Sequence, residues 1–255
     1  MRPVLDDKVV LVTGAAGGIG AAACRVLADA GARLVVSDIA EDAGRAIAAT
    51  LCAEGREAIF VPADLSSEAA IEALVVQPVA HFGRLDGAFN NAGMEQHNTP
   101  LDQLTLQQWD SVIRIDLTAV FLCIKYQVRA MLQTGGGAIV NTASGLGQIA
   151  IPNAAEYVAA KHGVIGITRA AAADYGARGI RVNALLPGIV RTPMIERLMQ
   201  DPAFSPHVER LRMRHLMQRF AEPAEIGEAA KWLLSDGASF VNGTALAVDG
   251  GALAN

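Results

Sequence analysis

The sequence lacks the features that mark membrane, nucleic-acid-binding and metal-binding proteins. No window in the 255 residues approaches the ~18 uninterrupted apolar residues typical of a membrane span. The formal net charge is -5 and no basic tract is present, so we expect no nucleic-acid partner and no membrane role. The cysteines and histidines are scattered without metal-ligand spacing, which predicts no metal site: Cys24, Cys52, Cys123, His81, His97, His162, His207 and His215.

The N-terminus also lacks a signal-peptide pattern, because Asp6 and Asp7 arrive before any apolar core. Together with the scattered cysteines this predicts a cytoplasmic protein in a reducing compartment. Hydrophobic residues make up 52% of the chain and charged residues 18%, as in a globular protein with a well-filled interior. We expect residues 1–255 to form a single domain.

Short apolar runs alternate with helical stretches along the whole chain. We expect strands near residues 8–13, 33–37, 57–62, 85–90, 138–143, 181–186 and 245–248, and helices near 18–30, 41–54, 66–82, 105–132, 154–178 and 224–235. This order predicts an α/β fold, a doubly wound parallel sheet of about seven strands with helices on both faces. Pro78 lies inside the third helix and is expected to kink it or end its first half.

A glycine-rich turn follows the first predicted strand. Gly14, Gly18 and Gly20 stand between the apolar run 9–12 and an alanine-rich helix. Strand, glycine turn and helix is the layout that places a pyrophosphate at a helix N-terminus, although the spacing is not that of the standard dinucleotide fingerprint. An ordinary flexible turn is the alternative.

The second predicted strand ends at Asp38, about 20 residues after the glycine turn. A carboxylate there accepts hydrogen bonds from an adenine-ribose diol and repels a 2′-phosphate. Neither Ala15 nor Ala16 supplies a base to pair with a phosphate, so the sequence favours NAD over NADP. A helix N-cap is a second role for Asp38, and the two roles are compatible.

Tyr157 and Lys161 lie four residues apart in the helix predicted at 154–178, so they share one face. A lysine ammonium beside a phenol favours the phenolate, whereas a free tyrosine titrates near ~10 and is a poor base at neutral pH. The pair is therefore a candidate proton-transfer device. The spacing alone is weak, since surface helices also place Tyr and Lys four apart.

These motifs together resemble the short-chain dehydrogenase/reductase family over nearly the whole chain. Residues 13–20 resemble its Thr-Gly-x-x-x-Gly-x-Gly turn, and residues 90–93 match its Asn-Asn-Ala-Gly. Ser144, thirteen residues before Tyr157, matches its catalytic serine. Asp64-Leu65 resembles the acidic pair that contacts adenine, residues 187–192 resemble the segment around the nicotinamide, and residues 249–251 resemble the C-terminal signature.

The resemblance implies hydride transfer between NAD and a secondary alcohol or ketone. Tyr157 would move the hydroxyl proton, Lys161 would assist it and hold the nicotinamide ribose, and Ser144 would hydrogen-bond the substrate oxygen. Motifs and resemblance assign these residues to the cofactor: Gly14, Gly18, Ile19, Gly20, Asp38, Asp64, Leu65, Asn91, Ala92, Gly93, Tyr157, Lys161, Pro187, Gly188, Val190 and Thr192. A turn role for Ser144, Asn90 and Asn91, and an N-cap role for Asp64, are the alternatives.

One position departs from the family pattern. Asp116 stands where the family usually has an asparagine, which is thought to hold a helix kink and a water leading to the lysine. An ionised Asp116 would raise the pKa of Lys161 and could weaken its influence on Tyr157. Alternatively the relay needs only acceptors, and nothing is lost. We favour the second interpretation and count Asp116 among the catalytic candidates.

Residues 189–220 interrupt the alternation of strands and helices. The segment carries adaptable apolar side chains: Met194, Leu198, Met199, Met213, Leu216, Met217 and Phe220. By resemblance it is the substrate loop, so we expect a lid over an apolar substrate. Plain packing or a subunit contact is the alternative.

The substrate expected from the candidate pocket is a neutral or weakly polar cyclic or aliphatic alcohol. The segments concerned carry few charges: 94–98, 146–151, Gly188 and 194–217. The resemblance also implies a homotetramer built from the helices at 105–132 and 154–178 and the last strand. Small apolar residues in the second of these helices agree with an interface, unless that face packs on the sheet.

Two functions remain in competition. The first is an NAD-dependent alcohol dehydrogenase or ketoreductase, and the second is a catalytically weak NAD-binding sensor or scaffold. The presence of Ser144, Tyr157 and Lys161 favours the first, and only Asp116 favours the second. An enoyl reductase on the same scaffold is disfavoured, because by resemblance those relatives separate Tyr and Lys more widely.

Overall fold

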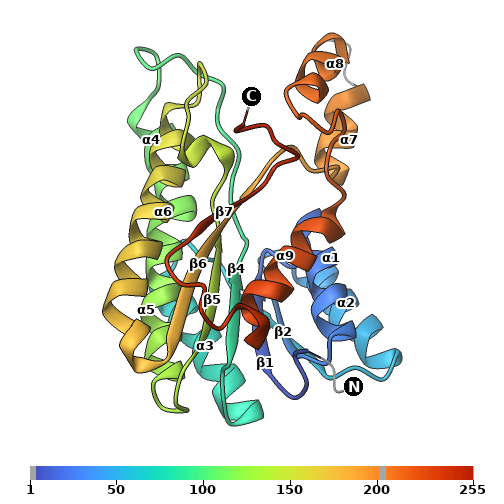
Figure 1. Ribbon diagram of the computed structural model, residues 1–255, viewed down its shortest axis with the longest axis vertical. Coiled ribbons are helices and arrows are strands. Elements are labelled where there is room, and N and C mark those ends of the chain that lie inside the picture. Colours follow the sequence, from blue (N-terminus) through green and yellow to red (C-terminus); the bar gives the residue numbers. More distant parts are fainter. Residues whose placement is uncertain (1–3, 201–204, 255) are drawn as a thin grey trace.

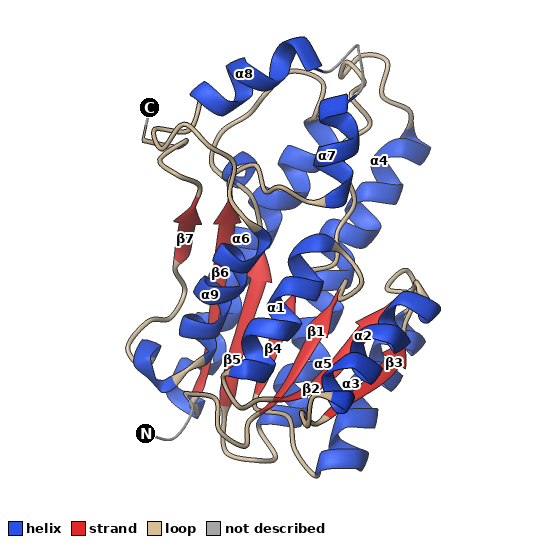
Figure 2. Ribbon diagram, turned by 90° about the vertical axis from the view of Figure 1, so that its right-hand side faces the viewer, coloured by secondary structure: helices blue, strands red, loops and turns tan. Residues whose placement is uncertain are grey.

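A parallel sheet forms the centre of the molecule (Figures 1 and 2). The computed structural model describes residues 4–200 and 205–254. The strands lie in the order β3-β2-β1-β4-β5-β6-β7 and all pair in parallel. They are β1 (Val9–Thr13), β2 (Arg33–Asp38), β3 (Ala58–Pro62), β4 (Gly87–Asn90), β5 (Gly137–Thr142), β6 (Ile180–Pro187) and β7 (Ala245–Val248). The order reverses between β1 and β4, which is where a doubly wound sheet opens its ligand crevice.

Helices cover both faces of the sheet (Figure 1). One layer contains α1 (Gly18–Asp29), α2 (Glu41–Ala53) and α9 (Pro223–Leu234). The other contains α3 (Glu68–Phe82), α4 (Leu106–Ile113), α5 (Ala119–Met131) and α6 (Ala155–Tyr175). The α/β fold predicted from the sequence is confirmed, with element bounds that differ from the expected ones by a few residues.

The strands are buried on both faces, as their continuous apolar runs require. In β1, Val9 and Leu11 pack toward the layer of α3, α5 and α6, whereas Val10 and Val12 pack toward α1 and α9. The alternation follows from the two-residue period of a strand. Within the described ranges, none of the helices combines the length and apolarity needed to cross a membrane.

Two helices differ from the sequence prediction. The long helix expected at 105–132 is divided by a π-helical turn, Arg114–Thr118, that carries Asp116. Such turns are rare and often occur at functional sites. The expectation that Pro78 ends the first half of its helix is wrong, because α3 continues to Phe82 with Pro78 inside it. Pro78 is buried together with Ile71, Leu74 and Val75, and this packing holds the helix together across the missing N–H.

Residues 189–220 contain α7 (Pro193–Gln200) and α8 (Ser205–Met213). Figure 2 shows both helices beyond the carboxyl ends of the strands. Val190 and Ala221 form an isolated parallel bridge, so the segment leaves and rejoins the body at one place. The side chains of Met194 and Leu198, which the sequence assigned to the lid, lie outside the described residues.

A buried polar network joins the sheet to the helices behind the site. Asn90 Nδ2 donates to Asn141 Oδ1 (2.9 Å) and to Gln127 Oε1 (3.0 Å), and Gln127 Nε2 donates to Asn90 Oδ1 (2.7 Å). Asn141 Nδ2 donates to Thr168 Oγ1 (2.9 Å). Satisfied buried amides of this kind specify one arrangement. They fix the ends of β4 and β5 relative to α5 and α6.

Candidate active site

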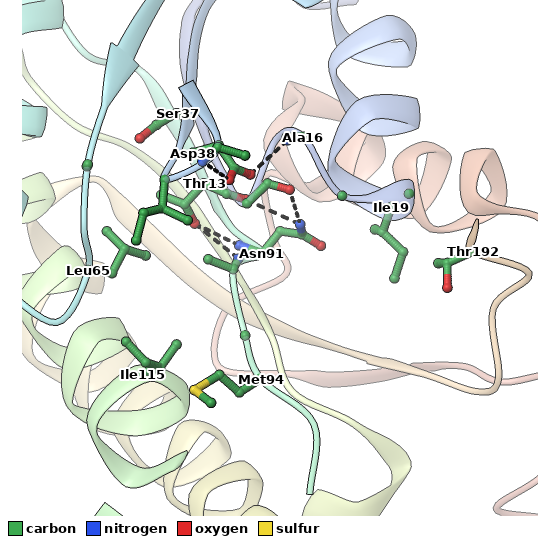
Figure 3. Close-up of a pocket in the computed structure, with 18 of the residues that line it drawn as sticks. Thr13, Ala16, Ile19, Ser37, Asp38, Leu65, Asn91, Met94, Ile115 and Thr192 are labelled. Carbon is green, nitrogen blue, oxygen red and sulfur yellow. Dashed lines mark hydrogen bonds between the residues drawn. The ribbon is translucent and has the colours of Figure 1, made fainter. Parts of the chain in front are cut away.

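A cavity of about 720 Å³ opens at the carboxyl ends of β1, β2 and β4 (Figure 3). This is the switch point of the strand order, where ligands bind in doubly wound sheets. Figure 3 shows Asp38, Thr13 and Asn91 gathered at the strand ends, and Ile19 and Thr192 on another side of the space. Of the predicted cofactor residues, the following line the cavity: Gly14, Gly18, Ile19, Asp38, Asp64, Leu65, Asn91, Ala92, Gly93 and Thr192.

The glycine turn brings the backbone close to the cavity. Gly14 has φ +63°, and a Cβ on it would lie 2.7 Å from the Ala92 Cα. A Cβ on Gly20 would overlap the Gly14 carbonyl, so only glycine fits at this position against the turn. The first α1 bond runs from Ala21 N to Gly17 O (2.8 Å). The N–H groups at the start of α1 therefore have no partner within the helix, and together with the helix dipole they fit a pyrophosphate.

Thr13 and Asn91 connect the ends of β1 and β4. Thr13 Oγ1 accepts from the backbone N–H groups of Asn91 (3.1 Å) and Ala92 (3.2 Å). Asn91 Nδ2 donates in return to the carbonyls of Thr13 and Gly14, each at 3.2 Å. These bonds seat Asn91, Ala92 and the glycine turn against one another, so the wall of the cavity is pre-formed.

Two acids mark one end of the cavity. Asp38 Oδ2 accepts from Ala16 N (2.8 Å) and its Oδ1 accepts from Ala40 N (2.9 Å), which fixes the carboxylate and leaves lone pairs for a ribose diol. Hydrogen bonds from the main chain and side chain of Ser66 lower the pKa of Asp64. Ser67, rather than Asp64, caps α3.

Across the described part of the chain, no three His, Cys, Asp or Glu side chains are placed to share a metal ion.

Tyr157 and Lys161 lie on α6 beside the end of β5, and Ser144 follows that strand two residues later. Lys161 Nζ lies 5.2 Å from the Tyr157 ring centre and donates to Thr142 O (3.2 Å), the last residue of β5. Ser144 caps the short 3-10 turn Gly145–Gly147, and its Oγ accepts from Leu146 N (3.2 Å). That turn packs on α6, since a Cβ on Gly147 would lie 2.8 Å from Lys161 O. Ser144 thus has the expected turn role at the position of the predicted catalytic serine.

Asp116 and Lys161 form a buried ion pair. Asp116 Oδ2 lies 3.0 Å from Lys161 Nζ, and Asp116 Oδ1 accepts from Met94 N (2.6 Å). Burial by itself would lower the pKa of Lys161, but the negative charges of a Tyr157 phenolate and of Asp116, with the hydrogen bond to Asp116, together raise that pKa above its ordinary value. Lys161 therefore stays an ammonium across the neutral range.

The ion pair borders the cavity through Gly93. A Cβ on Gly93 would lie 3.3 Å from Asp116 Oδ2 and 3.5 Å from Lys161 Nζ. Gly93 lines the cavity, so the ion pair lies directly behind the backbone of Gly93, next to the space where a cofactor would bind. The glycine at this position keeps the approach to Lys161 open.

The segment after β6 forms the next part of the site. Gly188 N donates to Val248 O (3.1 Å), and Val190 is buried at the base of the 189–220 segment. Pro187, Gly188 and Val190, which the sequence assigned to the cofactor, are not among the residues that line the cavity. Thr192 lies against the glycine turn, since a Cβ on Gly18 would be 2.9 Å from it. Thr192 and Pro193, near the start of residues 189–220, thus line the cavity.

Two buried side chains of the site were missed by the sequence analysis. Glu156, next to Tyr157, is 0% exposed and accepts from His97 N (2.7 Å). His215 is 4% exposed; its Nδ1 lies 3.0 Å from Leu211 O and its Nε2 accepts from Ile189 N (3.1 Å). No spacing pattern indicates either residue, because the bonds to His97 N and Ile189 N join each side chain to a backbone group in another segment of the chain.

Comparison with known proteins agrees with the geometry. The family model described as Enoyl-(Acyl carrier protein) reductase, one of the short-chain dehydrogenase models, matches residues 14–252. The 2,5-dichloro-2,5-cyclohexadiene-1,4-diol dehydrogenase of Sphingobium indicum is 48% identical over 97% of each chain. The cis-4-hydroxycyclohexanecarboxylate dehydrogenase of Sinomonas cyclohexanicum is 44% identical over 98% of each chain.

A solved structure is similar over the same length. The gluconate 5-dehydrogenase of Burkholderia cenocepacia, in complex with NADP and tartrate, superposes with a TM-score of 0.92 and 34% identity, over 100% of this chain and 98% of that one. The sequence matches extend over nearly the full length, and the structural match and the parallel strand order agree with them. The chain belongs to the short-chain dehydrogenase/reductase family.

Proposed function

We propose that this protein is an NAD-dependent oxidoreductase that transfers a hydride between the nicotinamide and a secondary alcohol or ketone. One observation carries the proposal: the Lys161 ammonium is held 5.2 Å from the Tyr157 ring centre, beside a cavity with a dinucleotide-type turn. The proposal is supported by the names of relatives that act as dehydrogenases on alcohols.

Tyr157 is the general acid and base of the proposed reaction. The nicotinamide, when bound, supplies the hydride chemistry. Tyr157 takes the hydroxyl proton when an alcohol is oxidised and returns a proton to the carbonyl oxygen when a ketone is reduced. Ser144 Oγ already accepts from Leu146 N, so its O–H is free to donate to the substrate oxygen and stabilise developing charge.

Lys161 serves Tyr157 as a fixed positive charge. An ammonium has three donors. One reaches Thr142 O and another faces Asp116, which leaves the third for a ribose hydroxyl or a proton-relay water. A raised pKa keeps the ammonium charged, and Asp116 offsets part of its field at Tyr157.

We propose NAD as the preferred cofactor. Asp38 is held by two backbone N–H groups, so it cannot turn away from a 2′-phosphate without breaking them. Asp64 adds negative charge at the same end of the cavity. The NADP complex of the Burkholderia relative shows that the family's cavity also admits a 2′-phosphate. The choice therefore depends on the acids of this chain.

We propose a secondary alcohol on a six-membered ring, or its ketone, as the substrate. The Sphingobium and Sinomonas relatives are named for substrates in which a cyclohexadiene or cyclohexane ring bears hydroxyl groups. The apolar side chains of Met94 and Ile115 lie beside each other in the lining of the cavity, which suits a ring with few charges (Figure 3). An enoyl thioester, suggested by the description of the family model, is the competing substrate to include in an assay.

We extend the proposal to the organisation of the chain. Residues 189–220 are proposed to act as a lid, since Thr192 and Pro193 contact the glycine turn at Gly18. The two helix layers, α1, α2 and α9 on one face and α3, α5 and α6 on the other, pack on the same sheet, which supports a single domain. A cytoplasmic location is supported by the free thiols of Cys24, Cys52 and Cys123.

The protein is expected to form a homotetramer. On α6, Ala160 and Val164 pack inward, whereas Gly166, Ala170 and Ala173 are exposed, and α5 exposes Phe121. Small residues allow helices from two subunits to approach closely, so Ala170→Glu should shift the assembly to smaller species. Sedimentation velocity at micromolar concentration measures the size of the wild-type assembly and of the Ala170→Glu assembly. A monomeric profile for the wild type would reject the tetramer.

Tyr157→Phe should lower kcat by at least ~10²-fold, because it removes the proton-transfer group. The measurement is NADH formation across cyclohexanols and cyclohexane diols, and the reverse reaction on cyclic ketones and on an enoyl thioester. Tyr175→Phe removes a hydroxyl from the other end of α6 and should leave turnover unchanged. A Tyr157→Phe variant with wild-type turnover would refute the assignment. Tight NAD binding without turnover of any substrate would favour the sensor.

Asp38→Asn should raise the ratio of kcat/KM with NADP to kcat/KM with NAD by about tenfold or more, since it removes one like charge facing the 2′-phosphate. The amide oxygen can still accept one of the two backbone N–H groups. Asp42→Asn, on the exposed first turn of α2, is the matched control for net charge. An unchanged ratio would show that Asp38 does not select the cofactor.

Asp116→Asn should change kcat less than tenfold, because the amide keeps an acceptor for Met94 N and Lys161 keeps Thr142 O. The pair has a pH signature. Since the Lys161 pKa is raised, the stability that the pair contributes is present below the ordinary lysine value of 10.5 and is lost as pH rises through the raised value.

The difference in melting temperature between wild type and Asp116→Asn should therefore be largest near neutral pH and shrink above about pH 10.5. Thermal melts from pH 7 upward, with kcat at neutral pH, provide both readouts. A hundredfold loss of kcat would show that the carboxylate itself is required. A pH-independent difference in melting temperature would contradict the ion pair.

A further inference from the structure

The wall that follows β4 is irregular yet heavily anchored. Residues 91–100 contain no helix or strand, and Met94 lines the cavity. Two carboxylates that are both 0% exposed hold this wall by its backbone: Asp116 accepts from Met94 N at 2.6 Å, and Glu156 accepts from His97 N at 2.7 Å. Asp116 also serves Lys161. Glu156 has no role in the chemistry proposed above.

Glu156 is a glutamate in the interior of the protein, where ionisable side chains are rare. It lies in the first turn of α6, where the helix dipole favours a negative charge, and the N-cap residue Ala154 contributes no side-chain hydrogen bond. Its Oε2 is buried and makes no hydrogen bond to any described residue. A buried carboxylate with one hydrogen bond is unfavourable for folding. Packing alone therefore does not account for a carboxylate here.

The group that Glu156 holds is connected to α4 as well. His97 Nε2 lies 3.2 Å from Ser111 Oγ, and Ser111 donates its own proton to Gln108 O (2.7 Å), so the histidine nitrogen is the donor. Thr99 Oγ1 donates to His97 O and accepts from Gln108 Nε2, each at 3.3 Å. His97 is thus fixed between α4 and α6.

We propose that Glu156 is a positioning residue that sets the substrate wall, residues 94–98, at a fixed distance from Tyr157. The two residues are neighbours on α6, so the bond from His97 N to Glu156 ties the wall directly to the helix turn that carries the proton-transfer group. This inference rests on the proposed function, because it takes the wall to face the substrate of Tyr157.

The proposal separates substrate binding from cofactor binding. The cofactor end of the wall is held independently, at Asn91 and Ala92 by Thr13 and at Met94 by Asp116. Releasing His97 from Glu156 should therefore loosen the wall beyond Met94 and leave the glycine turn and Asp38 in place. Affinity for substrate falls, and affinity for NAD does not.

Glu156→Met and Glu156→Gln test the proposal. Methionine fills a similar volume without an acceptor, whereas glutamine keeps one acceptor oxygen and removes the buried charge. Because Glu156→Met loses a hydrogen bond to a charged group, hydrogen exchange in residues 94–98 should accelerate about tenfold or more. The KM for the substrate should rise by a similar factor, and the KM for NAD should stay within twofold of the wild-type value. Glu156→Gln should match wild type in the exchange rate of residues 94–98, the KM for the substrate and the KM for NAD. Its melting temperature should be no lower than that of wild type.

Hydrogen-exchange mass spectrometry and NAD binding need no knowledge of the substrate. A failure of the proposed function, seen with Tyr157→Phe, is therefore distinguishable from a failure of this inference. Unchanged exchange in residues 94–98 of Glu156→Met would overturn the proposal. Equal rises in the KM for substrate and NAD, or exchange accelerated throughout α6, would overturn it too, because they indicate a general structural role. If Glu156→Met does not fold, failure of Glu156→Gln to match wild-type exchange and KM would overturn the proposal.

Discussion

The buried ammonium of Lys161 is the constraint on which the site depends. A charge taken out of water must be paired and hydrogen-bonded, and here the partners come from three elements: α6 supplies the lysine, β5 the carbonyl of Thr142, and the π-helical turn the carboxylate of Asp116. Moving any one of them would leave a charge or a carbonyl unsatisfied. The ion pair therefore fixes the helix of Tyr157 against the sheet. The buried Gln127–Asn90–Asn141–Thr168 network also joins the sheet to α5 and α6.

Because Asp116 uses both oxygens, the proton-transfer centre and the cavity wall form one mechanical unit. Its Oδ2 faces Lys161 and its Oδ1 holds Met94, so a shift of the wall reaches the ammonium through a single side chain. Glu156 repeats the arrangement one helix turn away from Lys161, with His97 as its partner. Buried carboxylates thus replace regular secondary structure as the support of residues 94–98. This accounts for a loop that is irregular in backbone yet anchored at several points.

The glycine turn after β1 and the cavity beside it could be predicted from the sequence because their geometry depends on the backbone. Gly14 must be glycine where φ is +63° and Ala92 lies behind it, and such requirements appear as fixed spacings in the chain. The strands could be predicted because both faces of β1 are buried. The Glu156–His97 and His215–Ile189 contacts could not, since each joins separate segments of the chain and leaves no periodic signal. Pro78 misled for the same reason, because the packing of its helix outweighs one missing hydrogen bond.

The two halves of the site therefore differ in how readily they can change. In the cofactor half, most contacts come from main-chain groups and glycines, where a new side chain overlaps backbone at Gly14 or Gly20. In the substrate half, single side chains hold whole segments: Glu156 holds the wall after β4, and His215 holds Ile189 at the base of the lid segment. His215 also lies 3.0 Å from Leu211 O through its Nδ1, so one side chain links Ile189 to the end of α8. Substitution at either position would reshape the pocket around Tyr157 while the cradle for the dinucleotide stays intact. A scaffold divided in this way can accept many alcohols without rebuilding its hydride-transfer machinery.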